Sequence, residues 1–243
     1  MKFYYSFYLI IFILITPSSY CQSIGFFAGY GFLNMGEVNS DLKTSHSSFA
    51  SFGAFASPPE EVNGGLFLEG NIKFGIANFN LGLSGNYISS SGSFRYSDEI
   101  GLFEESYDVS TTEILGLFEI FIVEESIVKP FLQLAGGIGF AKAEHLGNLR
   151  IFADPTYNLK VTNTVDGSYF AGRIKGGLKF FVQSFVFEIG LGYRIADAGE
   201  LVGDHVENGI KYANMPVRDV NGKGIKFDYS GLILTGGISI LIF

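Results

Sequence analysis

Two groups of polar residues contain side-chain types that perform nucleophilic chemistry. They are His46 with Asp41, Ser47 and Ser48, and His205 with Asp204 and Glu207. A histidine oriented by a carboxylate takes the proton of a serine hydroxyl and so turns the serine into a nucleophile. No signature spacing links these residues, and histidines beside serine and aspartate are also ordinary solvated loop residues. We therefore expect no catalytic residue from these groups alone.

An acidic stretch offers the oxygen ligands that calcium ions prefer. The stretch DAGELVGDHVEN, which begins at Asp197, contains four carboxylates. Calcium sites combine about six to eight oxygen ligands in a loop of defined spacing. This spacing matches no known calcium loop, and the plain alternative is a solvated acidic loop. We expect no metal and no cofactor here.

The elements that carry these polar groups are predicted to be β-strands. Eight segments alternate apolar and polar residues, and helical periodicity competes nowhere. The segments are approximately 23–34, 64–76, 79–95, 107–123, 130–143, 168–182, 185–197 and 225–243. Longer gaps (35–63, 96–106, 144–167, 198–224) alternate with shorter ones (77–78, 124–129, 183–184). An up-and-down antiparallel barrel predicts this alternation, because its loops lie on one rim and its tight turns on the other. A Greek-key sandwich does not.

The first 21 residues have the pattern of an export signal. Lys2 precedes an apolar run of 13 residues at 3–15, and the sequence SYC supplies small residues for cleavage after Cys21. Residues 22–243 would then form one barrel domain. A retained helical anchor is the alternative, but the run is too short to span a bilayer. Lipidation of Cys21, the only cysteine, is a second alternative.

The composition indicates that the strands cross a membrane. Of 243 residues 26 are Phe and 32 are Gly, only 16% are charged, and the mean hydropathy is +0.30. After residue 20 no stretch offers the roughly 18 consecutive apolar residues of a membrane helix, whereas most segments reach the ~9–11 residues of a membrane strand. The chain after residue 21 carries 15 basic and 24 acidic residues, which argues against nucleic-acid partners.

Strand parity predicts one polar and one apolar face. In YFAGRIKGGLKFF, residues 169–181, the cations stand at odd positions, and Phe170, Ile174, Leu178 and Phe180 stand at even ones. A two-residue turn at 183–184 places odd positions of this strand on the same face as even positions of the next. The segment FVFEIGLGYRI obeys this rule, and the hairpin around 77–78 gives the same division independently.

Glycine crowds the polar face, which indicates that this face lines a narrow lumen while the apolar face meets lipid. The alternative, a soluble lipocalin-like barrel with the apolar face inside, would overfill its interior. Charges in a narrow lumen need partners, so we predict an ion-pair network that plugs it. Its predicted members are Glu69, Lys73, Glu113, Glu119, Arg173, Lys175, Lys179, Glu188 and Arg194.

Turn parity also predicts how two of these pairs meet. It sets Lys179 opposite Glu188, an ion pair across neighbouring strands. It sets Arg173 opposite Arg194, a repulsion that Glu113 or Glu119 would have to relieve.

Several segments together resemble one family. SIGFFAGYGF, PFLQLAGGIGFA, FEIGLGYRI and the final GGISILIF are similar to small outer-membrane β-barrel proteins of the OmpA/OmpX-like type, across residues 22–243. Gln22 after the cleavage site looks like exported proteins of Bacteroidetes-type bacteria. The resemblance implies an outer-membrane protein with both termini in the periplasm, surrounded by lipids and lipopolysaccharide. It assigns the carboxy-terminal Phe243 as the signal for the barrel-assembly machinery. Ile238, Ile240 and Ile242 compete with Leu241 and Phe243 for the lipid face.

Three functions remain open for such a barrel. The favoured one is a non-enzymatic structural or surface-interaction role, in which the loops 35–63, 144–167 and 198–224 bind an extracellular protein or glycan, because these loops are longer than strand connection requires. The second is a narrow channel, which the crowded lumen disfavours. The third is an outer-membrane lipid-modifying enzyme built on the histidine groups. The acidic bias of the first two loops adds the hypothesis that they share divalent cations with lipopolysaccharide phosphates.

Overall fold

The computed structural model describes residues 22–50, 57–76, 79–123, 126–219 and 221–242. The predicted export signal at 1–21 with Cys21, the turn at 77–78 and the predicted assembly signal Phe243 lie outside the described residues.

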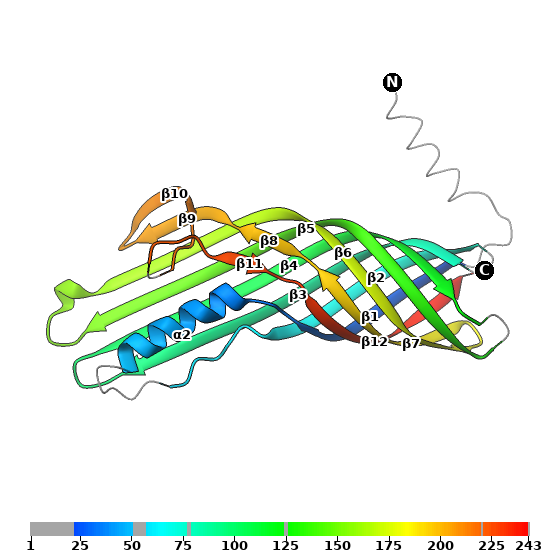
Figure 1. Ribbon diagram of the computed structural model, residues 1–243, viewed down its shortest axis with the longest axis horizontal. Coiled ribbons are helices and arrows are strands. Elements are labelled where there is room, and N and C mark those ends of the chain that lie inside the picture. Colours follow the sequence, from blue (N-terminus) through cyan, green and yellow to red (C-terminus); the bar gives the residue numbers. More distant parts are fainter. Residues whose placement is uncertain (1–21, 51–56, 77–78, 124–125, 220, 243) are drawn as a thin grey trace, which may run out of the picture.

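Eight antiparallel strands close into a ring (Figure 1). They are β1 (Gln22–Phe32), β2 (Gly64–Ile76), β3 (Phe79–Ser97), β4 (Gly101–Phe121), β5 (Val128–Ile151), β6 (Leu159–Val182), β7 (Phe185–Ile195) and β12 (Gly231–Ile242). Each pairs with the next around the ring, and β12 closes it against β1. The predicted eight-stranded, all-β up-and-down barrel is confirmed. Closure satisfies the backbone hydrogen bonds of the ring internally, which is the condition for a sheet to span lipid.

The predicted strand registers are also confirmed at both short hairpins. Val182 pairs with Phe185 around a two-residue turn in which Gln183 has a φ of 54°. Ile76 pairs with Phe79 at the other hairpin. Both registers place the charged positions on the inner face, as strand parity requires.

Large apolar side chains cover the outer face of the ring. Aromatic residues mark the boundary of this band toward the long loops: Tyr30, Phe32, Tyr87, Phe140, Phe170 and Tyr193. Beyond that level the outer face of β3 to β6 carries Ser, Thr and charged residues, such as Ser91, Asp108, Lys142, Thr164 and Asp166. Phe170 and Phe180 on β6 are ten residues apart, which spans about 25 Å at the usual strand tilt of roughly 40°. This height matches the lipid-facing band of a membrane barrel.

The facing of the last strand follows from the burial along β12. Ile238, Ile240 and Ile242 face outward, whereas Thr235 and Ser239 are buried in the lumen. The even positions of β12 therefore join the apolar band.

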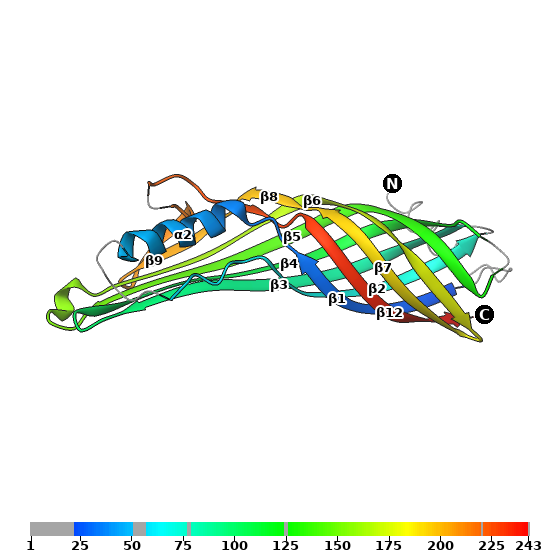
Figure 2. The same ribbon diagram turned by 60° about the horizontal axis from the view of Figure 1, so that its bottom comes forward.

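Strands β3 to β6 continue beyond the band and support a folded end that we call the cap (Figure 2). The cap comprises residues 33–63, 89–111, 141–168 and 196–230, apart from the undescribed 51–56 and 220. Its further elements are α2 (Gly36–Ala50), η1 (Pro155–Tyr157), β8 (Asp197–Glu200), β9 (Val202–Glu207), β10 (Ile210–Pro216) and β11 (Lys226–Asp228). β9 pairs with β6, β10 with β9, and β8 with β11.

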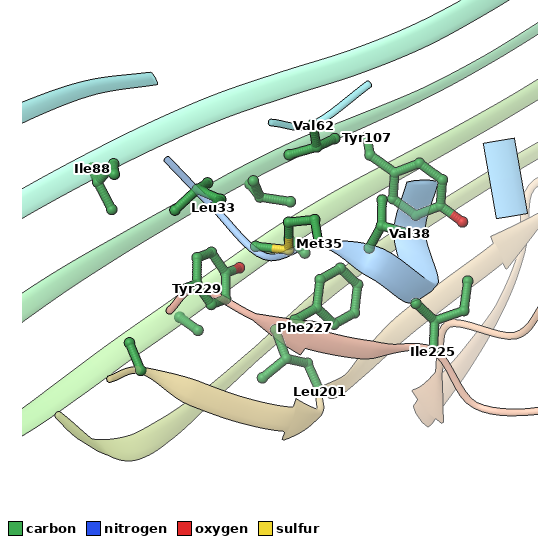
Figure 3. Packing of buried hydrophobic residues seen from close by; sticks show 14 of the residues in the cluster. Leu33, Met35, Val38, Val62, Ile88, Tyr107, Leu201, Ile225, Phe227 and Tyr229 are labelled. Carbon is green, nitrogen blue, oxygen red and sulfur yellow. The ribbon is translucent and has the colours of Figure 1, made fainter. Parts of the chain in front are cut away.

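The cap has a hydrophobic core, which α2 and β11 help to form against the inner face of the extended strands and which continues into the upper end of the barrel at Phe67, Leu115 and Ile233 (Figure 3). Met35, Val38 and Leu42 are fully buried in it. From the other side Phe227 and Tyr229 complete the core. Among the described residues no helix has the length and apolar character needed to cross a bilayer.

The prediction that 35–63, 96–106, 144–167 and 198–224 are loops is wrong. The sequence did not predict α2 because the buried side of this helix includes Asn39, Asp41 and Ser45 as well as Val38 and Leu42. Apolar residues therefore do not recur with the 3.6-residue period of a helix. Asn39 accepts a hydrogen bond from the Val62 amide at 2.7 Å, which replaces apolar contact at that position. The extensions of β5 and β6 were not predicted because polar residues and glycines, such as His145, Gly147, Asn163 and Gly167, interrupt the apolar positions of their inner face.

Candidate functional site

All nine residues of the predicted lumen network point inward and are nearly inaccessible to solvent. At the short-turn end, Glu119 on β4 lies between two lysines. Lys73 donates to it at 2.7 Å, and Lys179 from β6 forms a second, shorter contact. Gln133 and Asn80 donate to the same carboxylate at 3.1 and 2.7 Å. One carboxylate thus serves four donors, which satisfies its lone pairs in the absence of water.

The middle of the lumen holds two further acids. Arg173 donates to Glu69 through both terminal nitrogens, at 2.9 and 3.2 Å. Lys175 bridges Glu69, at 3.4 Å, and Glu188, at 2.8 Å. Lys179 stands directly opposite Glu188 in the strand register, and the two charged groups are 3.4 Å apart. Cations from β6 therefore join acids on β2 and β7.

The upper lumen explains how two opposed arginines coexist. Arg173 and Arg194 are register partners on β6 and β7, yet their guanidinium groups bind different acids. Arg194 donates to Glu113 at 2.7 Å and to Thr111 at 2.9 Å. Glu113, one of the two acids predicted to relieve the repulsion between the arginines, binds Arg194. Arg173 binds Glu69, which was not among the acids predicted for this role.

Strand parity places Asn71, Asn80 and Asn86 on the polar face, but the predicted network left them out, together with Gln133 and Tyr169. All five bond the same carboxylates, and their inward parity was a signal that could have included them. Aromatic rings add a further contact: the Phe131 ring lies 4.9 Å from Lys179 Nζ and 5.9 Å from Lys175 Nζ. The lumen is filled by mutually bonded side chains.

In the cap, five residues form a row on the inner face of the sheet. Tyr107, His145, Asn163, His205 and Tyr212 are successive register partners across β4, β5, β6, β9 and β10. His145 Nε2 lies 2.9 Å from Glu105, and its Nδ1 lies 2.8 Å from the Asn163 amide nitrogen. The Asn163 oxygen lies 2.6 Å from His205 Nδ1. The Tyr107 ring stacks on His145, and its hydroxyl donates to Asp41 at 2.7 Å.

The predicted nucleophile groups do not assemble into a triad. Ser47 and Ser48 donate to the backbone carbonyls of residues 43 and 44 on α2, and His46 packs edge-on against Phe94. Asp41 binds Tyr107. His205 belongs to the row described above, with Glu207 at 3.7 Å.

The acidic stretch from Asp197 spreads over β8 and β9. Asp204 pairs with Lys211 at 2.6 Å. Asp197 accepts from the Gly199 amide. Within the described part of the chain no group of three His, Cys, Asp or Glu residues has a geometry suited to a metal ion.

Charge is distributed very unevenly between cap and lumen. The cap contains 18 acidic and 9 basic residues, whereas the lumen network contains four acids and five bases. The net negative charge of the chain therefore resides in the cap.

The closed ring, its apolar outer band and its charged lumen define the class of the protein: a transmembrane β-barrel of the outer-membrane type. No protein-family model matches the sequence, and no curated protein matches it. Three solved structures are similar to the chain over most of its length.

Neisserial surface protein A shares 10% identity, covers 93% of this chain and 100% of its own, and has a TM-score of 0.42. Ail of Yersinia pestis, solved with the heparin analogue sucrose octasulfate, shares 12%, with 91% and 97% covered and a TM-score of 0.37. The outer membrane protease OmpT from Escherichia coli shares 10%, with 93% and 98% covered and a TM-score of 0.32. These likenesses are weak, so the class rests on the ring, the band and the lumen.

Proposed function

We propose that the protein is a non-enzymatic barrel of the bacterial outer membrane that binds an extracellular protein through its cap. Both termini would lie in the periplasm, because the described ends Gln22 and Ile242 pair with each other at the short-turn rim. Short periplasmic turns and long external loops are the usual arrangement of such barrels. A sequence tag inserted at the Asn208–Gly209 turn of the cap should then be labelled on intact cells.

The observation that carries the proposal is an exposed apolar surface at the far end of the cap. We call it the cap tip: Ile100, Phe152 and Tyr157, which are 67%, 56% and 66% exposed. The β5–β6 hairpin that carries two of them reaches the end of the molecule opposite the short turns (Figures 1 and 2). Large apolar side chains grouped at an exposed site mark an interaction surface.

The cap tip is built as a defined structure. The Phe152 amide donates to the Ile100 carbonyl at 2.9 Å and so joins two loop tips. Asp98 accepts from the amides of Ile100 and Gly101, both at 2.8 Å. Asp154 fixes the other loop by accepting from the Thr156 amide. An ordered tip loses little conformational entropy when it binds.

Charge selects the kind of partner. Asp98, Glu99 and Asp154 stand within two residues of cap-tip residues along the chain, as does Arg150, and the whole cap is acidic. A partner with an apolar pocket bordered by lysine or arginine fits this surface, and opposite charges would also speed the encounter. This favours a protein over an acidic glycan, which the cap would repel.

The lumen and the histidine groups support the proposal that the protein is neither a channel nor a lipid-modifying enzyme. A network in which every described charged member has a partner within 3.4 Å leaves the lumen blocked, so we expect no steady conductance in a planar bilayer. The serine hydroxyls on α2 are engaged by backbone carbonyls rather than by His46. We therefore propose neither a channel nor a lipid-modifying enzyme.

The test uses a photo-crosslinking residue at position 152 on intact cells, with the same residue at position 212 as the control site. A protein captured at 152 but not at 212 is then purified and its binding to the barrel in nanodiscs measured. Replacing Ile100, Phe152 and Tyr157 by Ser should weaken binding at least tenfold, and added salt should weaken it further. Equal binding by this variant, or capture of lipopolysaccharide alone at both sites, would contradict the proposal.

A further inference from the structure

The row that crosses the cap has room for a proton on the Nδ1 atom of only one of its two histidines. His145 and His205 each present Nδ1 to the same side-chain amide, that of Asn163. An amide has one accepting end and one donating end. Whichever way it is oriented, one imidazole must donate to it from Nδ1 and the other must accept at Nδ1. With the orientation present, His205 donates from Nδ1, and His145 accepts there and donates from Nε2 to Glu105.

Doubly protonated histidines do not fit this row. An imidazolium donates from both nitrogens, so protonation of the second histidine sets its Nδ1–H against the N–H group of Asn163. Asn163 is 4% exposed, which leaves little water to replace the lost bond. A buried donor without an acceptor costs as much as a lost hydrogen bond or more.

Charged and titratable groups face both histidines of the row. Glu105 faces His145 from β4, and its Oε2 is buried without a hydrogen-bond partner. Glu207 faces His205 on β9, and the Tyr212 ring packs beside it from β10. Further neighbours are Tyr107 of β4, Asp41 of α2 and Asp219, whose charge acts on Tyr107. Burial, with Asp41 beside it, raises the pKa of Tyr107 well above its ordinary value, so this hydroxyl stays protonated.

We propose that the row is a proton-operated latch between β6 and the arm formed by β9 and β10, residues 202–216. At neutral pH the row is closed and the arm lies against β6. At acid pH, when both imidazoles are charged, Asn163 cannot bond both, and the arm opens from β6 more often. β10 is the outermost strand of the sheet and pairs with β9, which in turn pairs with β6, so the arm can move without breaking the barrel ring.

Hydrogen exchange of the full barrel in nanodiscs tests the latch. Between pH 7.5 and pH 5.5, β9 amides should become about 5- to 100-fold less protected after correction for the intrinsic exchange rate, while β1 and β12 amides stay unchanged. The exchange of wild-type β9 must depend on pH, and a flat profile overturns the proposal.

Three variants separate the latch from a merely structural role. Asn163→Asp supplies two accepting oxygens, so both imidazolium groups can be bonded and the pH response should disappear with the arm closed. His145→Gln removes one titrating group and should also abolish the response. His46→Gln is the matched control, since this histidine lies on α2 against Phe94, and it should leave the response intact. A response that survives in Asn163→Asp, or that is lost in His46→Gln, overturns the latch.

Discussion

Among the residues of the lumen network, substitution of Glu119 should have a large effect on the stability of the barrel. Glu119 is fully buried between Lys73 and Lys179. Glu119→Gln keeps the shape of the side chain and removes its charge. The two lysines are then left with Glu188 alone, at 3.7 and 3.4 Å, and Glu188 already binds Lys175 at 2.8 Å. The lumen would hold five cations against three acids.

The expected cost follows from the burial of these charges. Removing one partner of a buried ion pair costs about 3–5 kcal/mol, and Glu119 is the partner of two lysines. We therefore expect a loss of about 5 kcal/mol in the free energy of unfolding, a large share of the ~5–15 kcal/mol that stabilises a typical domain. Adding Lys179→Met restores the balance of charge and should recover more than half of the loss. Glu104→Gln is the control, because its partner Arg95 is exposed and such pairs contribute less than about 1 kcal/mol.

The measurement is urea unfolding of the barrel in detergent micelles. The chain contains no tryptophan, so circular dichroism or the band shift between folded and heated protein on a gel replaces intrinsic tryptophan fluorescence. The reasoning is refuted if Glu119→Gln costs no more than Glu104→Gln, or if Lys179→Met adds to the loss in place of reversing it.

Three further predictions concern the band, the cap core and the contact between α2 and β11. Ile189→Arg on the lipid face should cost about 2–4 kcal/mol of unfolding free energy in vesicles, whereas Thr164→Arg on the outer face of the cap should change it by less than about 0.5 kcal/mol. Leu42→Ala should destabilise the cap by about 2–5 kcal/mol, seen as faster exchange of α2 amides while the barrel keeps its folded gel band. Hydrogen bonding from the Lys226 amide lowers the pKa of Glu37, so this contact persists above the ordinary glutamate pKa and weakens as pH falls through the lowered value. Exchange of β11 amides should accordingly rise at acid pH, and Glu37→Gln should remove that rise.

The barrel was predictable because two environments impose a period of two on its strands. Lipid selects the even positions of β6, such as Phe170, and the lumen selects the odd ones, such as Arg173. The cap offers no such contrast. α2 buries Asn39 and Asp41 beside Val38, and the cap strands place His145 and Asn163 on their inner face, so hydropathy gives no pattern to read.

The members of the lumen site were likewise predictable, but their contacts were only partly so. Register identifies Glu188 as the partner of Lys179 across neighbouring strands. The shortest contact of Lys179 is instead with Glu119 on β4, across the lumen. In a narrow barrel long side chains reach strands that are not adjacent, and their choice depends on the packing of rings such as Phe131. Pairing rules for neighbouring strands cannot supply this information.

The lumen charges affect the register of the strands as well as the stability of the barrel. A buried ion network is weak grounds for stability, because apolar side chains of similar volume often do as well. A shift of one residue between strands, however, would turn the charges of β6 outward into lipid. Each lysine or arginine near the middle of the bilayer costs about 2–4 kcal/mol, and β6 alone carries Arg173, Lys175 and Lys179. For these three cations such a slip would cost about 6–12 kcal/mol, which is comparable with the whole stability of a typical domain, and an apolar lumen would leave the same slip almost free. The charges thus fix which face of each strand meets lipid, and Lys179→Met, which relieves one charge, should also make register errors during assembly more frequent.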